Sequence, residues 1–130
     1  MRYLGIDYGS KKVGLAMSDE QGEFALPLDV WLMTSDLVAK IAGVCRSQKI
    51  DTIIMGESLN YDGQLNPIGH KAKAVGEELS ALGFKIEWLP EWYSSKAAER
   101  DIGRDEMYDA RAAAIILQMY LDKLRYARLA

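Results

Sequence analysis

The first quarter of the chain alternates between apolar runs and short polar turns. Arg2 to Tyr8 has the apolar pattern of a buried strand, and residues 9–12, Gly-Ser-Lys-Lys, have the composition of a turn. Val13 to Ser18 alternates apolar residues with small or polar ones, which predicts the returning strand. Phe24 to Leu32 is predicted as a third strand, at an edge of the sheet because Pro27 interrupts it. Three strands joined by tight turns predict an antiparallel meander.

The pattern then changes to helices alternating with short strands. Apolar residues recur at helical spacing from Asp36 to Gln48, and Thr34 or Ser35 can cap this helix. Thr52 to Met55 is a short apolar run of the kind found in buried parallel strands. The residues that follow, 57–66, are polar and predict a loop.

The second half of the chain repeats this alternation. Pro67 is expected to begin a helix that runs to about Leu82, and Gly83 to stop it. Phe84 to Leu89 is predicted as the fifth strand. A short helix near Lys96 to Arg100 and a long one from about Met107 to Tyr126 are expected to follow.

A meander followed by crossover units predicts an α/β fold. The expected architecture is a five-stranded mixed sheet, antiparallel in its first part and parallel in its second, with helices on both faces. Ligands on such sheets gather at the carboxyl ends of the parallel strands.

Composition narrows the class of protein. The 130 residues fit one domain, 1–130, and 49% of them are apolar, enough for a core. The chain lacks a run of about 18 apolar residues and a signal-peptide pattern at its start, so we expect a cytoplasmic protein outside the membrane. Its one cysteine, Cys45, is expected to be a core thiol. A net charge of -3 argues mildly against broad electrostatic binding of nucleic acid but leaves a carboxylate-based nuclease possible.

Three carboxylates lie at strand ends or at a helix start, where the predicted fold would place a ligand-binding site. Asp7 ends an apolar strand and has glycines on both sides, at positions 5 and 9. Glu91 follows the fifth strand, and Asp109 falls in the first turn of the last helix, before a run of alanines typical of tight packing. Each has a structural alternative, since Asp7 could cap a turn, Glu91 could be solvated, and Asp109 could interact with the helix dipole. Together, three carboxylates can hold Mg²⁺ or Mn²⁺, which polarise a phosphate and activate water.

Basic residues near these positions could contact phosphate. Lys11 and Lys12 lie beside the first turn, and Arg111 follows Asp109 by two residues. We therefore take these three as candidate substrate-binding residues.

The chain resembles the YqgF family of the ribonuclease H-like superfamily, described as Holliday-junction-resolvase-like proteins and as nucleases for the 5′ end of pre-16S ribosomal RNA. The resemblance extends over nearly the whole chain. It is carried by four segments, which are residues 5–14 (GIDYGSKKVG), 59–63 (LNYDG), 91–99 and 109–118.

The resemblance implies a metal-dependent endonuclease with Asp7, Glu91 and Asp109 as catalytic and metal-binding residues. It adds Asn60 and Asp62 as substrate-binding candidates. The implied partner is nucleic acid, either pre-rRNA or branched DNA, and the protein is expected to be a monomer or a homodimer.

The sequence departs from the family pattern at two points. The family usually has Asp-Glu-Arg where this chain has Pro90-Glu91-Trp92, so an arginine beside Glu91 is replaced by Trp92. Trp92 could pack as peripheral core or stack on an unpaired base. After the fourth strand the family has a small apolar pair, whereas this chain has Glu57-Ser58, so Glu57 is a candidate fourth metal ligand.

Two other functions compete with the nuclease. A non-catalytic nucleic-acid-binding or ribosome-associated module on the same fold is favoured by the Trp92 substitution and opposed by the three carboxylates. An ATP-dependent sugar kinase or chaperone-type ATPase shares the Gly-Ile-Asp-x-Gly-Ser opening, but needs two such lobes, and this chain has the length of one.

Overall fold

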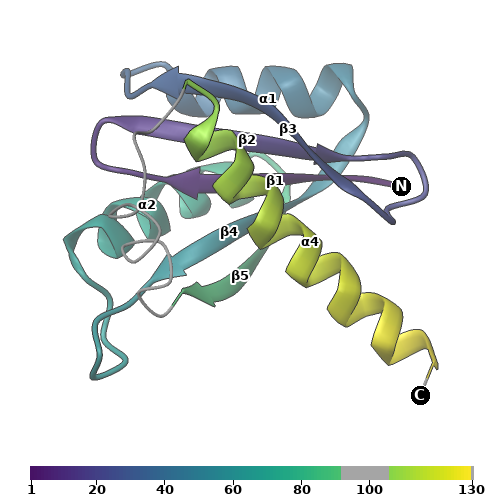
Figure 1. The fold of residues 1–130 in the computed structure, drawn as a ribbon. Helices are drawn as coiled ribbons and strands as arrows, with labels where there is room; N and C mark the ends of the chain where they lie inside the picture. The colour runs from purple at the N-terminus through teal and green to yellow at the C-terminus, as the bar shows by residue number, and fades with distance from the viewer. Residues whose placement is uncertain (92–105, 130) are drawn as a thin grey trace.

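The computed structural model describes residues 1–91 and 106–129, and within them the predicted mixed sheet is confirmed (Figure 1). Its five strands are ordered β3-β2-β1-β4-β5. Their bounds are β1 Arg2–Tyr8, β2 Lys12–Ser18, β3 Ala25–Leu32, β4 Ile50–Ser58 and β5 Lys85–Glu91. The helices are α1 Leu37–Ser47, α2 Pro67–Ala81 and α4 Tyr108–Leu129. The short helix expected near residues 96–100 lies outside the described residues.

The meander forms where the sequence predicted it. β1 pairs with β2 and β2 with β3, both antiparallel, and β3 is an edge strand as its Pro27 indicated. β4 pairs parallel with β1, and β5 pairs parallel with β4. The carboxyl ends of β1, β4 and β5 therefore lie at one edge of the sheet, called here the carboxyl edge.

β4 is longer than the sequence indicated. It runs from Ile50 to Ser58 rather than from Thr52 to Met55, so Glu57 and Ser58 belong to the strand and not to a loop. They pair with Pro90 and Glu91 of β5. The expected loop start at Glu57 was wrong because strand pairing with β5 outweighs the polar composition of this segment.

The helix starts follow different rules. α2 begins as predicted at Pro67, with the side chain of Asn66 accepting a hydrogen bond from the Gly69 amide, and Gly83 ends it with a positive φ of 102°. In α1 the capping position is Asp36, without a side-chain capping bond, rather than Thr34 or Ser35. The Thr34 hydroxyl is instead bonded to the Asp36 carboxylate, which removes it from the capping role.

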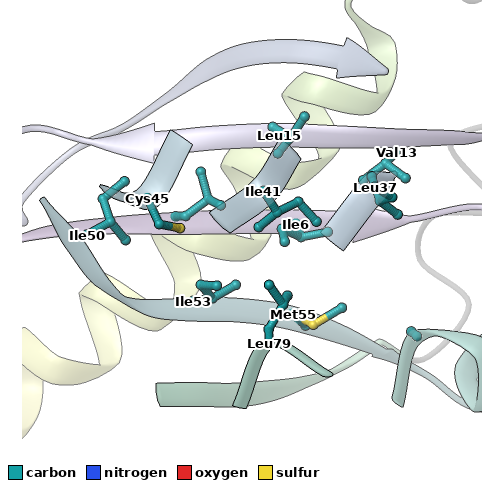
Figure 2. Packing of buried hydrophobic residues seen from close by; sticks show 12 residues of the cluster. Ile6, Val13, Leu15, Leu37, Ile41, Cys45, Ile50, Ile53, Met55 and Leu79 are labelled. Atoms are coloured by element: carbon teal, nitrogen blue, oxygen red, sulfur yellow. The ribbon is translucent and has the colours of Figure 1, made fainter. Parts of the chain in front are cut away.

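Helices cover both faces of the sheet, with α4 on one face and α1 and α2 on the other (Figure 1). Between the sheet and α1 and α2 lies the larger core, which includes Ile6, Leu15, Ile41 and Met55 (Figure 2). Cys45 is fully buried in it, and burial raises the pKa of its thiol to about 11, as expected for a core residue. Within the described residues, none of the helices combines the length and apolar character needed to cross a bilayer.

The second core lies between α4 and the other face of the sheet. Ala113, Ile116, Leu117 and Leu121 are buried against Ala16 and Ile54. A Cβ at Gly5 would lie 2.8 Å from the Leu117 Cβ and 3.0 Å from the Ala113 carbonyl oxygen, so the helix backbone approaches β1 closely. The alanine run after Asp109 indicated this packing, and the structure confirms it.

Candidate active site

Asp7 and Asp109 are brought to the same face of the sheet by a glycine. Asp7 pairs with Gly14 of β2, and residues directly opposite one another in an antiparallel pair share a face. A Cβ at Gly14 would overlap the carbonyl oxygen of Asp109 and lie 2.9 Å from the Ala110 amide nitrogen. The first turn of α4 therefore rests on β2 directly beside Asp7.

At Gly14 the protein's own helix occupies the space beside the backbone, which leaves no room there for a ligand. Gly9 has the expected turn role, because its amide donates to the Lys12 carbonyl oxygen at 3.0 Å.

Glu91 reaches the same face from β5. It is the last residue of that strand and pairs with Ser58 of β4. A Cβ at Gly56 would overlap the Glu91 Oε2 and lie 2.7 Å from its Cδ, and it would also lie 3.1 Å from the Cδ1 of Ile116 in α4. The Glu91 carboxylate therefore occupies the space left by the missing side chain of Gly56, on the α4 side of the sheet. Burial there raises the pKa of Glu91, because desolvation disfavours the charged form.

The three carboxylate residues lie on the same face and at the same edge of the sheet. Across residues 1–91 and 106–129, we find no group of three or more His, Cys, Asp or Glu side chains placed to hold a metal ion. The convergence of all three on shared metal ions stays a prediction.

Glu57 lies on the opposite face of the sheet. It alternates with Gly56, whose missing Cβ faces α4, and it forms an ion pair with Lys73 of α2, with 2.8 Å between Nζ and Oε2. The Lys73 ammonium also sits 3.9 Å from the centre of the Trp88 ring. The structure thus separates Glu57 from Asp7, Glu91 and Asp109, because strand alternation assigns it to the α2 face, and it does not support Glu57 as a fourth ligand.

The basic candidates lie around this edge. Lys11 and Lys12 are exposed at the β1–β2 turn, next to the end of the strand that carries Asp7. Arg111 is exposed in the first turns of α4. Trp92 lies outside the described residues.

Asn60 and Asp62 belong to a tight turn that extends from the end of β4. The Asn60 amide donates to the Gln64 carbonyl at 2.8 Å, and the Asp62 carboxylate accepts a hydrogen bond from the Gln64 amide at 3.0 Å. Gly63 adopts a φ of 83°, which the turn requires. Leu59 and Leu65 bridge the base of the turn. The turn therefore holds Asn60 and Asp62 at the carboxyl edge by its own hydrogen bonds.

We expect Glu91→Gln to stabilise the metal-free protein at neutral pH. A carboxyl group whose pKa is raised in the folded state favours folding below its unfolded pKa and loses that contribution as pH rises through the folded pKa. The variant should therefore melt about 2–5 °C higher at pH 7.5 in EDTA, and the difference should vanish near pH 4. The matched control is Glu77→Gln on the exposed side of α2, which should leave the melting temperature unchanged. Equal melting curves for Glu91→Gln and the wild type at pH 7.5 would contradict the burial argument.

This combination of a meander, two parallel crossover strands and an α4-covered carboxyl edge defines a ribonuclease H-like fold. Among solved structures, the chain aligns with RuvC of T. thermophilus in complex with a Holliday junction substrate, at a TM-score of 0.60 and 15% identity, covering 100% of this chain and 96% of that one. It also aligns with the fowlpox virus Holliday junction resolvase, at a TM-score of 0.57 and 14% identity, covering 95% and 99%. The expected ribonuclease H-like architecture is thereby confirmed.

The chain belongs to the RuvX family, whose model, described as Holliday junction resolvase, matches residues 1–123. A relative from Anaeromyxobacter sp. (strain Fw109-5), named "Putative pre-16S rRNA nuclease", is 37% identical over 94% of this chain and 97% of its own length. A relative of the same name from Halalkalibacterium halodurans is 34% identical over 95% and 97%. The expected family resemblance is confirmed, and the family is one of nucleases.

Proposed function

We propose that this chain is a metal-dependent endonuclease, formed by a single domain, that trims the 5′ end of pre-16S ribosomal RNA in the cytoplasm. Asp7, Glu91 and Asp109 are its catalytic carboxylates. The observation that carries the proposal is that two glycines, Gly14 and Gly56, clear the α4 face of the sheet so that these three residues share one edge.

The donor set fits a hard divalent cation. All three candidates offer carboxylate oxygens, which Mg²⁺ and Mn²⁺ prefer. Burial raises the pKa of Glu91 because desolvation disfavours its charged form, and a nearby cation offsets that cost. Mg²⁺ commonly binds through one or two carboxylates together with water and substrate phosphate, so a group of three preassembled ligands is not required. When bound, such an ion polarises the scissile phosphate and lowers the pKa of a bound water.

The remaining groups bind and orient the substrate. Lys11 and Lys12 provide positive charge at one side of Asp7, and Arg111 does so on α4 beside Asp109. Arg111 can form a planar, two-pronged contact with phosphate that a lysine cannot. The turn that carries Asn60 and Asp62 borders the same edge and supplies polar contacts to the substrate backbone.

Cleavage of two substrates, a ribosomal RNA precursor and a DNA junction, distinguishes an RNA-processing nuclease from a junction resolvase. The purified chain should cleave a 5′-extended 16S precursor fragment in Mg²⁺ or Mn²⁺, and activity should be lost in EDTA. A four-way DNA junction under the same conditions should be cut more slowly, because the named relatives point to ribosomal RNA. Faster cleavage of the junction would assign the activity to branched DNA instead. Binding of either substrate without cleavage in any divalent metal would contradict the nuclease assignment and favour a non-catalytic module.

A further inference from the structure

The two outer strands of the sheet, β3 and β5, differ in how regular their unpaired sides are. β3 is interrupted by Pro27, and its register with β2 shifts between Leu15 and Ala16. Proline and bulges of this kind are devices that keep an edge strand from pairing with another chain. β5, at the other edge, has an unbroken register with β4 over its whole length, and its proline comes only at position 90. Within the described part of the chain, residues 85–89 therefore present a regular strand edge, and Phe84 directly precedes it.

The side chains of this segment separate by face. Phe84, Ile86 and Trp88 pack, partly buried, against the core under α1 and α2, whereas Leu89 packs under α4. Alternation places Lys85 and Glu87 on the α4 face with Leu89. They form an ion pair of 3.4 Å within the strand, and their side chains are 69% and 36% exposed.

We propose that β5 pairs antiparallel with β5 of a second copy of this chain, with a two-fold axis at Ile86. The segment is self-complementary about that residue. Lys85 of one copy then lies opposite Glu87 of the other on the α4 face, and Phe84 lies opposite Trp88 on the α2 face. Opposite charges and aromatic pairs at directly facing positions both stabilise a strand pair. The interface is isologous, so each contact occurs twice.

Neighbouring registers are less favourable. A two-fold axis at Glu87 would place the two Glu87 carboxylates opposite each other, and an axis at Lys85 would do the same to the two lysines. Like charges at facing positions destabilise a strand pair. Charge therefore selects Ile86 as the centre.

The α2 face of this edge also has room for the facing aromatic rings. A groove of about 510 Å³ runs between α2 and β5, and its lining includes Lys73 and Glu77 of α2, Phe84, and Lys85, Ile86 and Trp88 of β5. The Cβ that Gly76 lacks would lie 2.6 Å from the Cζ2 of the Trp88 ring, so the ring packs directly against α2. The partner's Phe84 would then lie beside Trp88, next to this groove.

Charge reversal tests the register directly. Sedimentation velocity over a range of protein concentrations should show a dimer for the wild type. In the Lys85→Glu variant, a glutamate of one copy would face Glu87 of the other copy. The dissociation constant of the dimer should then rise about tenfold or more, because two attractive pairs become repulsive. Glu87→Lys should do the same. The matched control is Lys123→Glu on the exposed side of α4, which should leave the dimer intact.

Mixing the two single variants is the decisive measurement. Lys85→Glu carries two glutamates at these positions and Glu87→Lys two lysines, so neither can restore the ion pair within its own strand. Together they should form a heterodimer about as stable as the wild-type dimer. A monomeric wild type up to about 0.5 mM, single variants that dimerise like the wild type, or a mixture that stays monomeric would each overturn the proposal.

Discussion

Asp7→Asn is expected to reduce cleavage about a thousandfold while leaving the protein folded. The change removes one anionic ligand from the proposed metal site and keeps the size and shape of the side chain. Stabilisation of transition-state charge by a bound divalent ion is worth several kcal/mol, which corresponds to roughly this factor in rate. Cleavage of the 16S precursor fragment in saturating Mg²⁺ measures it. The melting temperature in EDTA should be equal or slightly higher, because one of three like charges at the edge is gone.

The matched control for Asp7→Asn is Asp51→Asn. Asp51 is an exposed carboxylate in β4, at the opposite end of the parallel strands from Asp7. It should cleave like the wild type. If Asp7→Asn instead lowered the melting temperature markedly and its folded fraction cleaved normally, Asp7 would be a structural residue and the site assignment would fail.

Gly14→Ala is expected to destabilise the protein by about 3 kcal/mol or more, equivalent to roughly a 10 °C lower melting temperature. The added methyl group would overlap the Asp109 carbonyl and crowd the Ala110 amide. Both obstacles are backbone atoms, so no side-chain rotation relieves the contact, and α4 must move away from β2. Because this movement displaces Asp109, the remaining folded protein should also cleave slowly.

The control is the same substitution in open space. Gly43 lies on the exposed side of α1, and nothing is within 4 Å of the Cβ that alanine would add. Alanine favours a helix over glycine by up to about 1 kcal/mol, so Gly43→Ala should raise the melting temperature by a few degrees. Thermal melts of the two variants should therefore change in opposite directions. A Gly14→Ala protein as stable as the wild type would show that α4 does not contact β2 as described.

Local patterns in the sequence were sufficient for most of the fold. The meander follows from short apolar runs separated by turn residues, and α2 from Pro67 and Gly83 at its two ends. These signals depend on neighbours in the sequence, which is why they could be interpreted without a structure. The end of β4 depends on pairing with β5 instead, and Gly56 and Glu57 give no local sign of a strand.

The candidate site was predictable only in part. Asp7 and Asp109 could be predicted as site residues because Asp7 ends an apolar strand and Asp109 lies at the start of a helix. The roles of Gly14 and Gly56 depend on which residues face them across the sheet, and this register is a tertiary property. The side of the sheet on which Glu57 lies also depends on how far β4 extends. Lys73, which pairs with Glu57, carries no signal in the sequence that would single it out from other helix lysines.

The packing of α4 also determines when the proposed site can assemble while the chain is being synthesised. The last helix of the chain covers its first strands, and the Gln118 side chain accepts a hydrogen bond from the Ala25 amide, 93 residues earlier. Synthesis proceeds from the N-terminus, so all five strands are made before this helix, and the helix can dock on the sheet only afterwards. Asp109 arrives with that helix. Until α4 has been synthesised, a nascent chain therefore lacks one of the three proposed carboxylates and cannot assemble the proposed site.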